Sequence, residues 1–216
     1  MKTQVIRKGH STAHIIPLLS RVLLILLTIS IQLLYIPTSN RLTGGFEPKL
    51  PIDVYPLIPV WVLPYILCYP LWLFAVIWAT LKMDDRLFRV FIASFLLAST
   101  LAVFIFIFFP TYVKESTIPG SDIFSNMLRF IHQEWGRYDA FPSGHIYITV
   151  LLALFYHRWY PRYKLYWIAI PIVVSFSTLF THQHYIADIA GGLAVAFIGS
   201  HFGQKWVRLS LARQRS

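Results

Sequence analysis

Charged side chains are scarce in this chain of 216 residues: Asp, Glu, Lys and Arg make up 13% of it, whereas 56% is hydrophobic. A soluble domain carries about a quarter charged residues. The shortage therefore excludes an ordinary soluble globular protein and indicates an integral membrane protein. Repeats, low-complexity tracts and a second domain are also missing. We expect one membrane domain over residues 14–203, between cytoplasmic tails at 1–13 and 204–216.

Cysteine is nearly absent as well. Cys68 stands alone inside an apolar run, and one cysteine excludes an internal disulfide. Nothing near it in the sequence indicates a metal cage or a reactive thiol. We expect Cys68 to be a packing residue.

Apolar runs of the length that a bilayer requires recur along the chain. They predict an all-α fold, a polytopic membrane helical bundle of six transmembrane helices at 15–36, 57–81, 88–109, 143–156, 165–180 and 185–202. The first run is long for a cleaved signal peptide and lacks a small-x-small cleavage site, so we expect an anchor that stays. Pro59, Pro64 and Pro70 predict an irregular start or a kink in the second helix.

The longest break between the predicted helices covers residues 110–140, and breaks of this length are often functional. Ser121 or Asp122 is suited to cap a short helix there. Apolar residues follow at helical spacing: Phe124, Met127, Leu128, Ile131 and Trp135. Such a helix either lies in the headgroup layer or packs on its neighbours, and the spacing does not separate the two.

Basic residues set the expected orientation. The formal net charge is +10, but Lys and Arg fall in short clusters between apolar runs, which favours membrane loops over nucleic-acid binding. With the N-terminus inside, 13 of the 19 Lys and Arg residues lie in the cytoplasm. Arg21 lies near the cytoplasmic end of the first helix, where it can snorkel. We expect a multi-pass protein of the plasma (inner) membrane with both termini cytoplasmic.

Two polar stretches, 141–145 and 181–188, then lie at helix starts on the outer face. Histidine and aspartate are costly at such a depth unless they pair, line water or do chemistry. His184 and Asp188 are four residues apart, so on one helix face the carboxylate can hold one imidazole nitrogen and leave the other free to attack. His145, from another helix, is suited to protonate a leaving alcohol.

Ser143 and the Gly144 amide extend this pattern, since hydroxyl and backbone donors at a helix N-terminus suit a phosphate. Two other interpretations stay open. Membrane histidines often form helix–helix hydrogen bonds, and a zinc site is compatible with the spacing of His145, His182, His184 and Asp188. A phosphate site accounts for Ser143 and Gly144 better than a metal does.

Pro142-Ser143-Gly144-His145, followed by His184-x-x-x-Asp188, resembles the type 2 phosphatidic acid phosphatase superfamily, which includes lipid phosphate phosphatases and vanadium haloperoxidases. The resemblance covers residues 52–203. The stretches 109–113 and 181–185 are most similar to the inositol-phosphotransferase-like branch. The resemblance to the superfamily implies that His184 forms a phosphohistidine and that Asp188 orients the His184 ring. It also implies that His145 protonates the leaving group and activates the acceptor. It implies no metal and no other cofactor.

Two positions depart from the family pattern. The first motif places Arg-Pro six residues after a lysine, but Ser121 stands seven positions after Lys114. The third motif begins Ser-Arg, and this chain has Ser177 and Thr178. Two phosphate-binding arginines are therefore missing. The candidate phosphate-binding residues are Ser143, Gly144, Lys114, Arg137 and His182.

The sequence thus predicts a membrane enzyme that hydrolyses a phosphoester or pyrophosphate bond of a phospholipid or isoprenoid phosphate in the outer leaflet. Transfer to an alcohol such as inositol would use the same residues, so a phosphotransferase is an open alternative. The missing arginines motivate a third alternative, a relative that binds lipid without turnover, against which the three intact catalytic residues count. A transporter is disfavoured because the third helix is almost uniformly apolar.

Overall fold

The structure, a computed structural model, describes residues 16–39, 44–134 and 138–213. Within them the chain is helical, and its β-pairing is limited to isolated bridges at Thr111. Five helical segments of these residues are long and apolar enough to cross a bilayer: Leu18–Pro37, Pro59–Lys82, Asp85–Phe108, Pro161–Phe180 and Ile186–Arg213. The protein is therefore a multi-pass helical membrane protein. The predicted fourth span, α6 (Gly144–Trp159), is shorter and is not among the five.

Prolines and capping residues account for the starts of the first helices. The first span comprises α1 (Leu18–Leu33) and α2 (Tyr35–Ser39). The irregular start predicted for the second is the 3₁₀ turn η1 (Pro59–Trp61), and α3 (Val62–Lys82) then continues through Pro70. The third helix, α4 (Asp85–Phe108), begins before the predicted position 88 because the Asp84 carboxylate accepts a hydrogen bond from Leu87 N.

Two segments predicted to lie outside the membrane helices, a loop and part of the C-terminal tail, are helical. The basic segment after α6 forms the 3₁₀ turn η2 (Pro161–Tyr163) and the first turn of α7 (Lys164–Phe180). The last helix, α8 (Ile186–Arg213), runs well past its predicted end at Phe202. No glycine or proline follows Gly203, and good helix formers such as Gln204, Lys205 and Arg208 continue the helix. Residues 204–213 of the predicted tail thus belong to α8.

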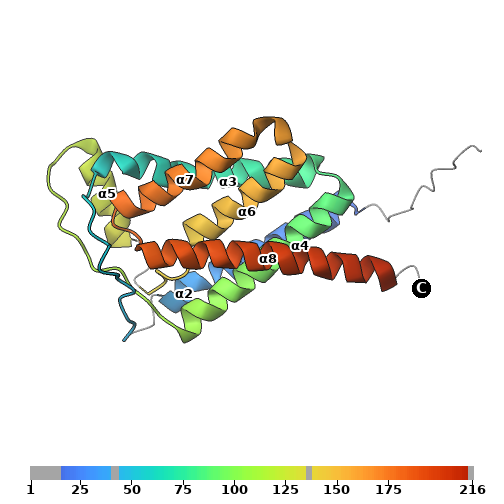
Figure 1. Cartoon of the computed structure of the whole chain (residues 1–216), viewed down its shortest axis with the longest axis horizontal. Helices are drawn as coiled ribbons and strands as arrows, with labels where there is room; N and C mark the ends of the chain where they lie inside the picture. The colour runs from blue at the N-terminus through green and yellow to red at the C-terminus, as the bar shows by residue number, and fades with distance from the viewer. Residues whose placement is uncertain (1–15, 40–43, 135–137, 214–216) are drawn as a thin grey trace, which may run out of the picture.

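Helix α6 is the core of the bundle. It packs between α7 and α8 (Figure 1), and Ile146, Tyr147, Leu151 and Phe155 are completely buried. The surrounding helices instead expose apolar faces, with 72% of Leu165 accessible. A soluble protein rarely exposes contiguous apolar faces, so these faces are suited to lipid contact.

Small residues on α8 allow α4 and α6 to approach closely. Gly192, Ala196 and Ser200 are buried and lie one turn apart on one face of the helix. A Cβ atom on Gly199 would lie 2.8 Å from the carbonyl oxygen of Ser94. The contact between α4 and α8, which cross in Figure 1, therefore depends on glycine, which has no side chain, at this position of α8.

The expected surface helix is present as α5 (Ile123–Glu134). Asp122 is its cap, because Oδ1 accepts hydrogen bonds from Phe124 N and Ser125 N. Leu128 and Ile131 are buried against Val62 and Tyr65, so α5 packs on the bundle. Trp135 lies outside the described residues. Cys68 is buried in the core, which agrees with a packing role.

The interpretation of Arg21 as a snorkelling residue is wrong. Its guanidinium is buried and lies 2.6 Å from the Asp85 carboxylate. It also donates hydrogen bonds to the carbonyl oxygens of Thr80 and Met83, and its Cζ lies 4.6 Å from the Phe88 ring centre. Arg21 therefore joins α1 to the turn between α3 and α4.

We predict that Arg21→Met lowers the stability of the bundle in detergent by about 2–4 kcal/mol, because it leaves Asp85 and two carbonyl oxygens without their donor. The melting temperature measures this loss. Lys82→Met, an exposed change in the same turn, is the control and should have little effect. In a double-mutant cycle, Asp85→Asn should recover part of the loss, and strict additivity of the two changes would contradict the pairing.

Candidate active site

The N-terminus of α8 fixes the two residues expected to form a pair. Asp188 is completely buried in the first turn, and its Oδ2 accepts a hydrogen bond from Tyr185 N at 2.8 Å. Ile186 N donates to Asp53 Oδ1. Two backbone donors that a helix start leaves unpaired are thereby satisfied by carboxylates.

His184 precedes this helix, so it does not share a helix face with Asp188, as the four-residue spacing suggested. The capping turn nevertheless brings the two together: Nδ1 of His184 lies 3.4 Å from Oδ2 of Asp188, although the angle does not form a hydrogen bond. The carboxylate thus faces one nitrogen of the imidazole. The other nitrogen, Nε2, has no hydrogen-bond partner among the described residues, and His184 lines a cavity.

The backbone around His184 is held from both sides. Gln183 N and His184 N both donate to the carbonyl oxygen of Thr178 near the end of α7, and the Tyr55 hydroxyl donates to the His184 carbonyl at 2.9 Å. His182, which lies in the turn between Thr178 and Gln183, has a positive φ of 52°. This conformation is uncommon for residues other than glycine. The turn from α7 to α8 is therefore well defined around the imidazole.

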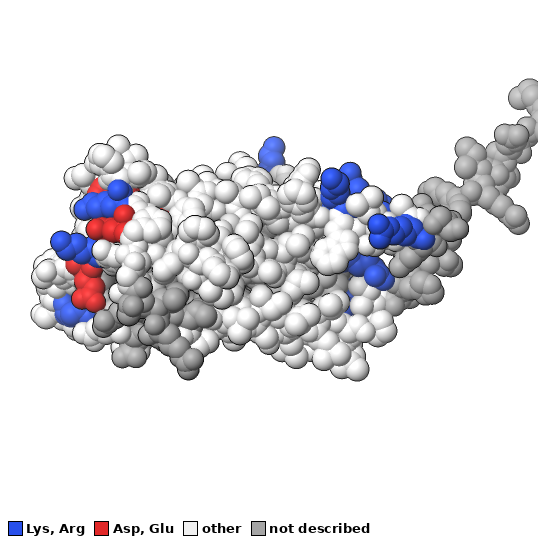
Figure 2. Space-filling view, turned by 90° about the horizontal axis from the view of Figure 1, so that it is seen from below, with Lys and Arg blue, Asp and Glu red and all other residues white. Residues whose placement is uncertain are grey.

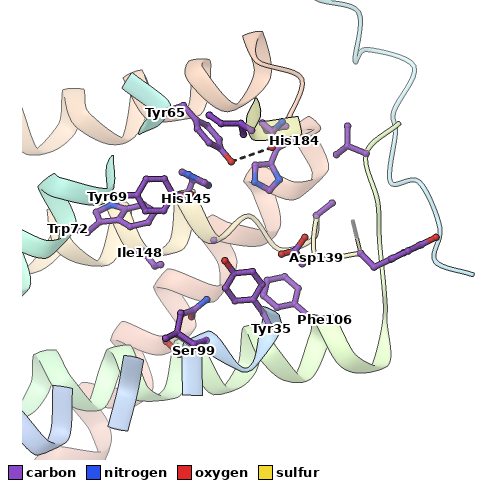
Figure 3. Close-up of a pocket in the computed structure, with 18 of the residues that line it drawn as sticks. Tyr35, Tyr65, Tyr69, Trp72, Ser99, Phe106, Asp139, His145, Ile148 and His184 are labelled. Carbon is purple, nitrogen blue, oxygen red and sulfur yellow. Dashed lines mark hydrogen bonds between the residues drawn. The ribbon is translucent and has the colours of Figure 1, made fainter. Parts of the chain in front are cut away.

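His145 enters the site from the start of α6. Its ring stacks on Tyr65 at a centroid distance of 4.1 Å and is also flanked by Tyr69 and Trp72 from α3. The centres of the His145 and His184 rings are 6.1 Å apart. Figure 3 shows the two rings side by side at one end of the cavity. The aromatic wall leaves His145 little freedom except toward the cavity.

Gly144 also lines this end of the cavity, and Ser143 is its neighbour in the chain. Ser143 N donates to the Asp188 carbonyl at 3.0 Å, which ties the first motif to the second. The Ser143 hydroxyl is buried without a partner. Around Gly144, a Cβ atom would meet only Tyr147 Cε1, at 4.0 Å, so open space adjoins the first turn of α6.

The buried polar side-chain atoms that lack a hydrogen-bond partner all belong to the predicted site. In the described part of the chain they are Ser143 Oγ, His145 Nε2, His184 Nδ1 and Asp188 Oδ1. Buried polar groups are normally paired, and an unpaired group often marks a functional site. Their convergence indicates a site built to receive a polar ligand.

The cavity is large, about 700 Å³, and mostly apolar. From the histidines it extends between α3, α4 and α1 to Leu73, Phe95 and Ile29. Figure 3 shows Tyr35, Phe106 and Ser99 opposite the two histidines. A polar ligand with an apolar chain fits this shape, because the charged residues and the histidines are gathered at one end.

The candidate phosphate ligands have different surroundings. Lys114 and His182 line the cavity. The His182 ring is already engaged: Nε2 donates to the Tyr55 carbonyl, and Nδ1 lies 2.7 Å from the Ser116 hydroxyl. Burial lowers the pKa of His182, which favours this neutral, hydrogen-bonded form. Arg137 lies outside the described residues.

The residues at the second departure from the family pattern do not line the cavity. Ser177 and Thr178 are completely buried, and their hydroxyls donate to carbonyl oxygens of their own helix. In the described parts of the chain, no arginine lines the cavity. Lys114 is therefore the only cavity cation there besides histidines.

Three acidic or histidine residues of the cavity were missed in the sequence: Glu115, His132 and Asp139. Asp139 lies at the cavity edge (Figure 3), and burial raises its pKa to about 6. Burial also lowers the pKa of His132, whose Nε2 donates to the Thr181 carbonyl. The helical spacing could have predicted that His132 faces the bundle, since His132 lies one turn beyond Leu128 on the buried face of α5. The signal for Asp139 was its place four residues before Ser143.

The zinc alternative finds no support in the side-chain arrangement. Among the described residues, no group of three or more His, Cys, Asp and Glu side chains is placed to hold a metal ion.

Comparison with known proteins identifies the family of the chain. A family model described as the PAP2 superfamily matches residues 56–202, a range that includes both motifs. A stretch of 68 residues is 34% identical to the inositol phosphorylceramide synthase catalytic subunit aur1 of Schizosaccharomyces pombe, and it covers 32% of this chain and 16% of that relative. No solved structure matches. Because the family model covers well over half of the sequence, the chain belongs to the PAP2 superfamily.

Proposed function

We propose that this protein cleaves a phosphoester or pyrophosphate bond of a membrane lipid through a phosphohistidine at His184. The observation that carries the proposal is the set of buried, unpaired polar atoms on Ser143, His145, His184 and Asp188. Of these four residues, the two histidines line one end of a large apolar cavity. Membership of the PAP2 superfamily and the match to a synthase of a phosphorylated lipid support a phosphatase or phosphotransferase enzyme.

The first chemical step forms a bond between Nε2 of His184 and phosphorus. The bond from phosphorus to the leaving oxygen breaks, and His145 gives that oxygen a proton. The imidazole becomes cationic as it is phosphorylated, and the Asp188 carboxylate, 3.4 Å from Nδ1, stabilises that charge. In the second step His145 takes a proton from water, which attacks phosphorus, breaks the P–N bond and regenerates His184.

Phosphate oxygens would be bound chiefly by neutral donors. The Ser143 hydroxyl has no other partner, and the first turn of α6 presents free backbone N–H groups beside Gly144. Lys114 supplies the nearest full positive charge. His182 would act indirectly, since its ring supports Tyr55, whose hydroxyl holds the His184 backbone.

The lipid chain would occupy the apolar part of the cavity between α1, α3 and α4. In this arrangement α6, the fourth span in chain order, also crosses the membrane, and most of its length is buried among the other helices. Figure 2 shows Lys and Arg alone at one end of the visible face and mixed with Asp and Glu at the other. The positive-inside rule then places both termini in the cytoplasm and the catalytic end on the outer side of the plasma membrane.

Transfer to an alcohol is the second candidate. The match to an inositol phosphorylceramide synthase subunit favours it, and the chemistry differs only in the acceptor that His145 deprotonates. Asp139 lies at the same end of the cavity and is suited to accept a hydrogen bond from such an acceptor.

We predict that His184→Ala abolishes phosphate release, a loss on the order of 10³-fold or more, because no other group replaces the nucleophile. Purified protein in detergent with a chelator is assayed on phosphatidic acid and undecaprenyl diphosphate. The control, His201→Ala, removes an exposed histidine of α8 and should match wild type. An acid-labile, alkali-stable phosphoprotein should form with wild type only.

Other outcomes of this assay separate the alternatives. Turnover by His184→Ala would contradict the phosphohistidine. Wild type that releases no phosphate but transfers the headgroup to inositol or another alcohol would be a phosphotransferase. Lipid binding without either reaction would identify a binding protein.

We predict that Gly144→Ala lowers phosphate release at least about tenfold while the protein folds normally, because the new methyl group points into space reserved for the substrate. Only Tyr147 Cε1, at 4.0 Å, is near a Cβ there. Gly192→Ala is the contrast: its Cβ would lie 2.8 Å from the Ser143 carbonyl oxygen, so it should lower the melting temperature. Unchanged turnover by Gly144→Ala would place the phosphate elsewhere.

We predict that Asp139→Asn stabilises the protein at neutral pH relative to wild type. The folded-state pKa is raised from 3.8 to about 6, so folded wild type holds a proton that the unfolded chain has lost, and its stability falls as pH rises through this window. The difference in melting temperature between Asp139→Asn and wild type should therefore grow from pH 4 to 6 and then level off. A difference independent of pH would contradict the buried carboxyl.

A further inference from the structure

A second cavity lies at the end of the bundle opposite the histidines. It has a volume of about 410 Å³. Its walls come from the start of α4, the end of α6 and the last turns of α8, which lie together at the same end of the bundle. The lining residues are Asp84, Arg86, Leu87, Val90, Arg158, Gln204, Val207, Arg208 and Leu211. We call this cavity the basal groove.

The basal groove has a net positive charge, with three arginines and one aspartate, and the arginines are unpaired among the described residues. Arg86, Arg158 and Arg208 make no hydrogen bond or ion pair with the described residues. Arg158 makes a cation–π contact, with its Cζ 5.4 Å from the centre of the Phe155 ring. The single acidic residue, Asp84, is engaged by Leu87 N. Arg21 at the same end, by contrast, is neutralised by Asp85. Three guanidinium groups around one groove repel one another unless an anion lies between them.

The extension of α8 provides the second wall of the basal groove. Gln204, Val207, Arg208 and Leu211 follow the i, i+3, i+4, i+7 spacing of one helix face. Between its polar groups this face is apolar, and Leu87 and Val90 of α4 continue the apolar surface. The reverse face of the extension exposes Trp206 and Leu209, 52% and 53% accessible. Apolar side chains exposed at the end of a membrane helix are suited to the interfacial layer of a bilayer.

We propose that the basal groove binds the phosphate headgroup of an anionic phospholipid, whose acyl chains lie against Leu87, Val90, Val207 and Leu211. Arginine forks match phosphate oxygens in geometry and charge, and basic pockets between membrane helices are suited to lipid headgroups. A soluble phosphate ion would satisfy the arginines but would leave the apolar wall uncovered. The groove shares no lining residue with the catalytic cavity, so this lipid is a bound ligand and not the substrate.

The test compares two variants that remove equal charge from the same end of the protein. The groove variant is Arg86→Gln/Arg158→Gln/Arg208→Gln, and the control is Arg162→Gln/Lys164→Gln/Lys205→Gln, none of which lines the groove. Delipidated protein in detergent is titrated with dioleoyl phosphatidylglycerol or dioleoyl phosphatidylcholine and analysed by native mass spectrometry. We expect phosphatidylglycerol to bind the groove variant on the order of 100-fold more weakly than wild type, with the control near wild type.

Parallel experiments test where the lipid binds and whether the bound phosphate belongs to a lipid or to a soluble anion. A phosphatidylglycerol with a diazirine next to the headgroup should label residues 204–211 and 84–90 in wild type and in His184→Ala, which separates this site from the catalytic one. Equal weakening in both charge variants would overturn the proposal in favour of a diffuse surface charge. Competition by millimolar inorganic phosphate or pyrophosphate, with binding indifferent to Leu211→Asn, would overturn it in favour of a soluble anion. Basal turnover on a soluble short-chain substrate should be the same in wild type and both charge variants.

Discussion

The buried carboxylate of Asp188 connects the local fold to the chemistry. Its Oδ2 caps α8 through Tyr185 N and lies 3.4 Å from the imidazole of His184, while its backbone oxygen accepts the hydrogen bond from Ser143 N. Because the residue is completely buried, water cannot replace these partners, and leaving any of them unpaired would be costly. The start of the helix, the orientation of the nucleophile and the joining of the two motifs thus depend on one residue.

Close backbone packing holds the two motifs together. A Cβ on Gly191 would lie 2.3 Å from the Phe141 ring, and one on Gly192 would lie 2.8 Å from the Ser143 carbonyl oxygen. The loop before α6 therefore rests directly on α8, and the distance between His145 and His184 is set by backbones and not by flexible side chains. Such a site needs little rearrangement when a substrate arrives.

Sequence alone was sufficient where the signal is local. Apolar runs predicted the five helices that are long enough to cross a bilayer. Polar residues at helix starts pointed to His145, His184 and Asp188, which the structure brings close together and whose catalytic roles stay predictions. Contacts between distant segments had no such signal. The pairing of Arg21 with Asp85 spans 64 residues, and the partners of His182 come from Tyr55 and Ser116, in two irregular segments. The sequence analysis therefore expected Arg21 to snorkel and His182 to bind phosphate. In the structure, both side chains are instead engaged by partners from distant segments.

If both proposals hold, the two ends of the bundle bind phosphate in different ways. At the catalytic end the described cavity has one lysine, no arginine and two carboxyl groups, Glu115 and Asp139, so the ground-state attraction for anions is modest. Stabilisation there has to come from dipoles and from the protons of the histidines, which act on charge that develops during transfer. At the opposite end three arginines lack a counterion. With the arginines far from the histidines, an anionic lipid bound in the basal groove does not compete with the substrate for the nucleophile.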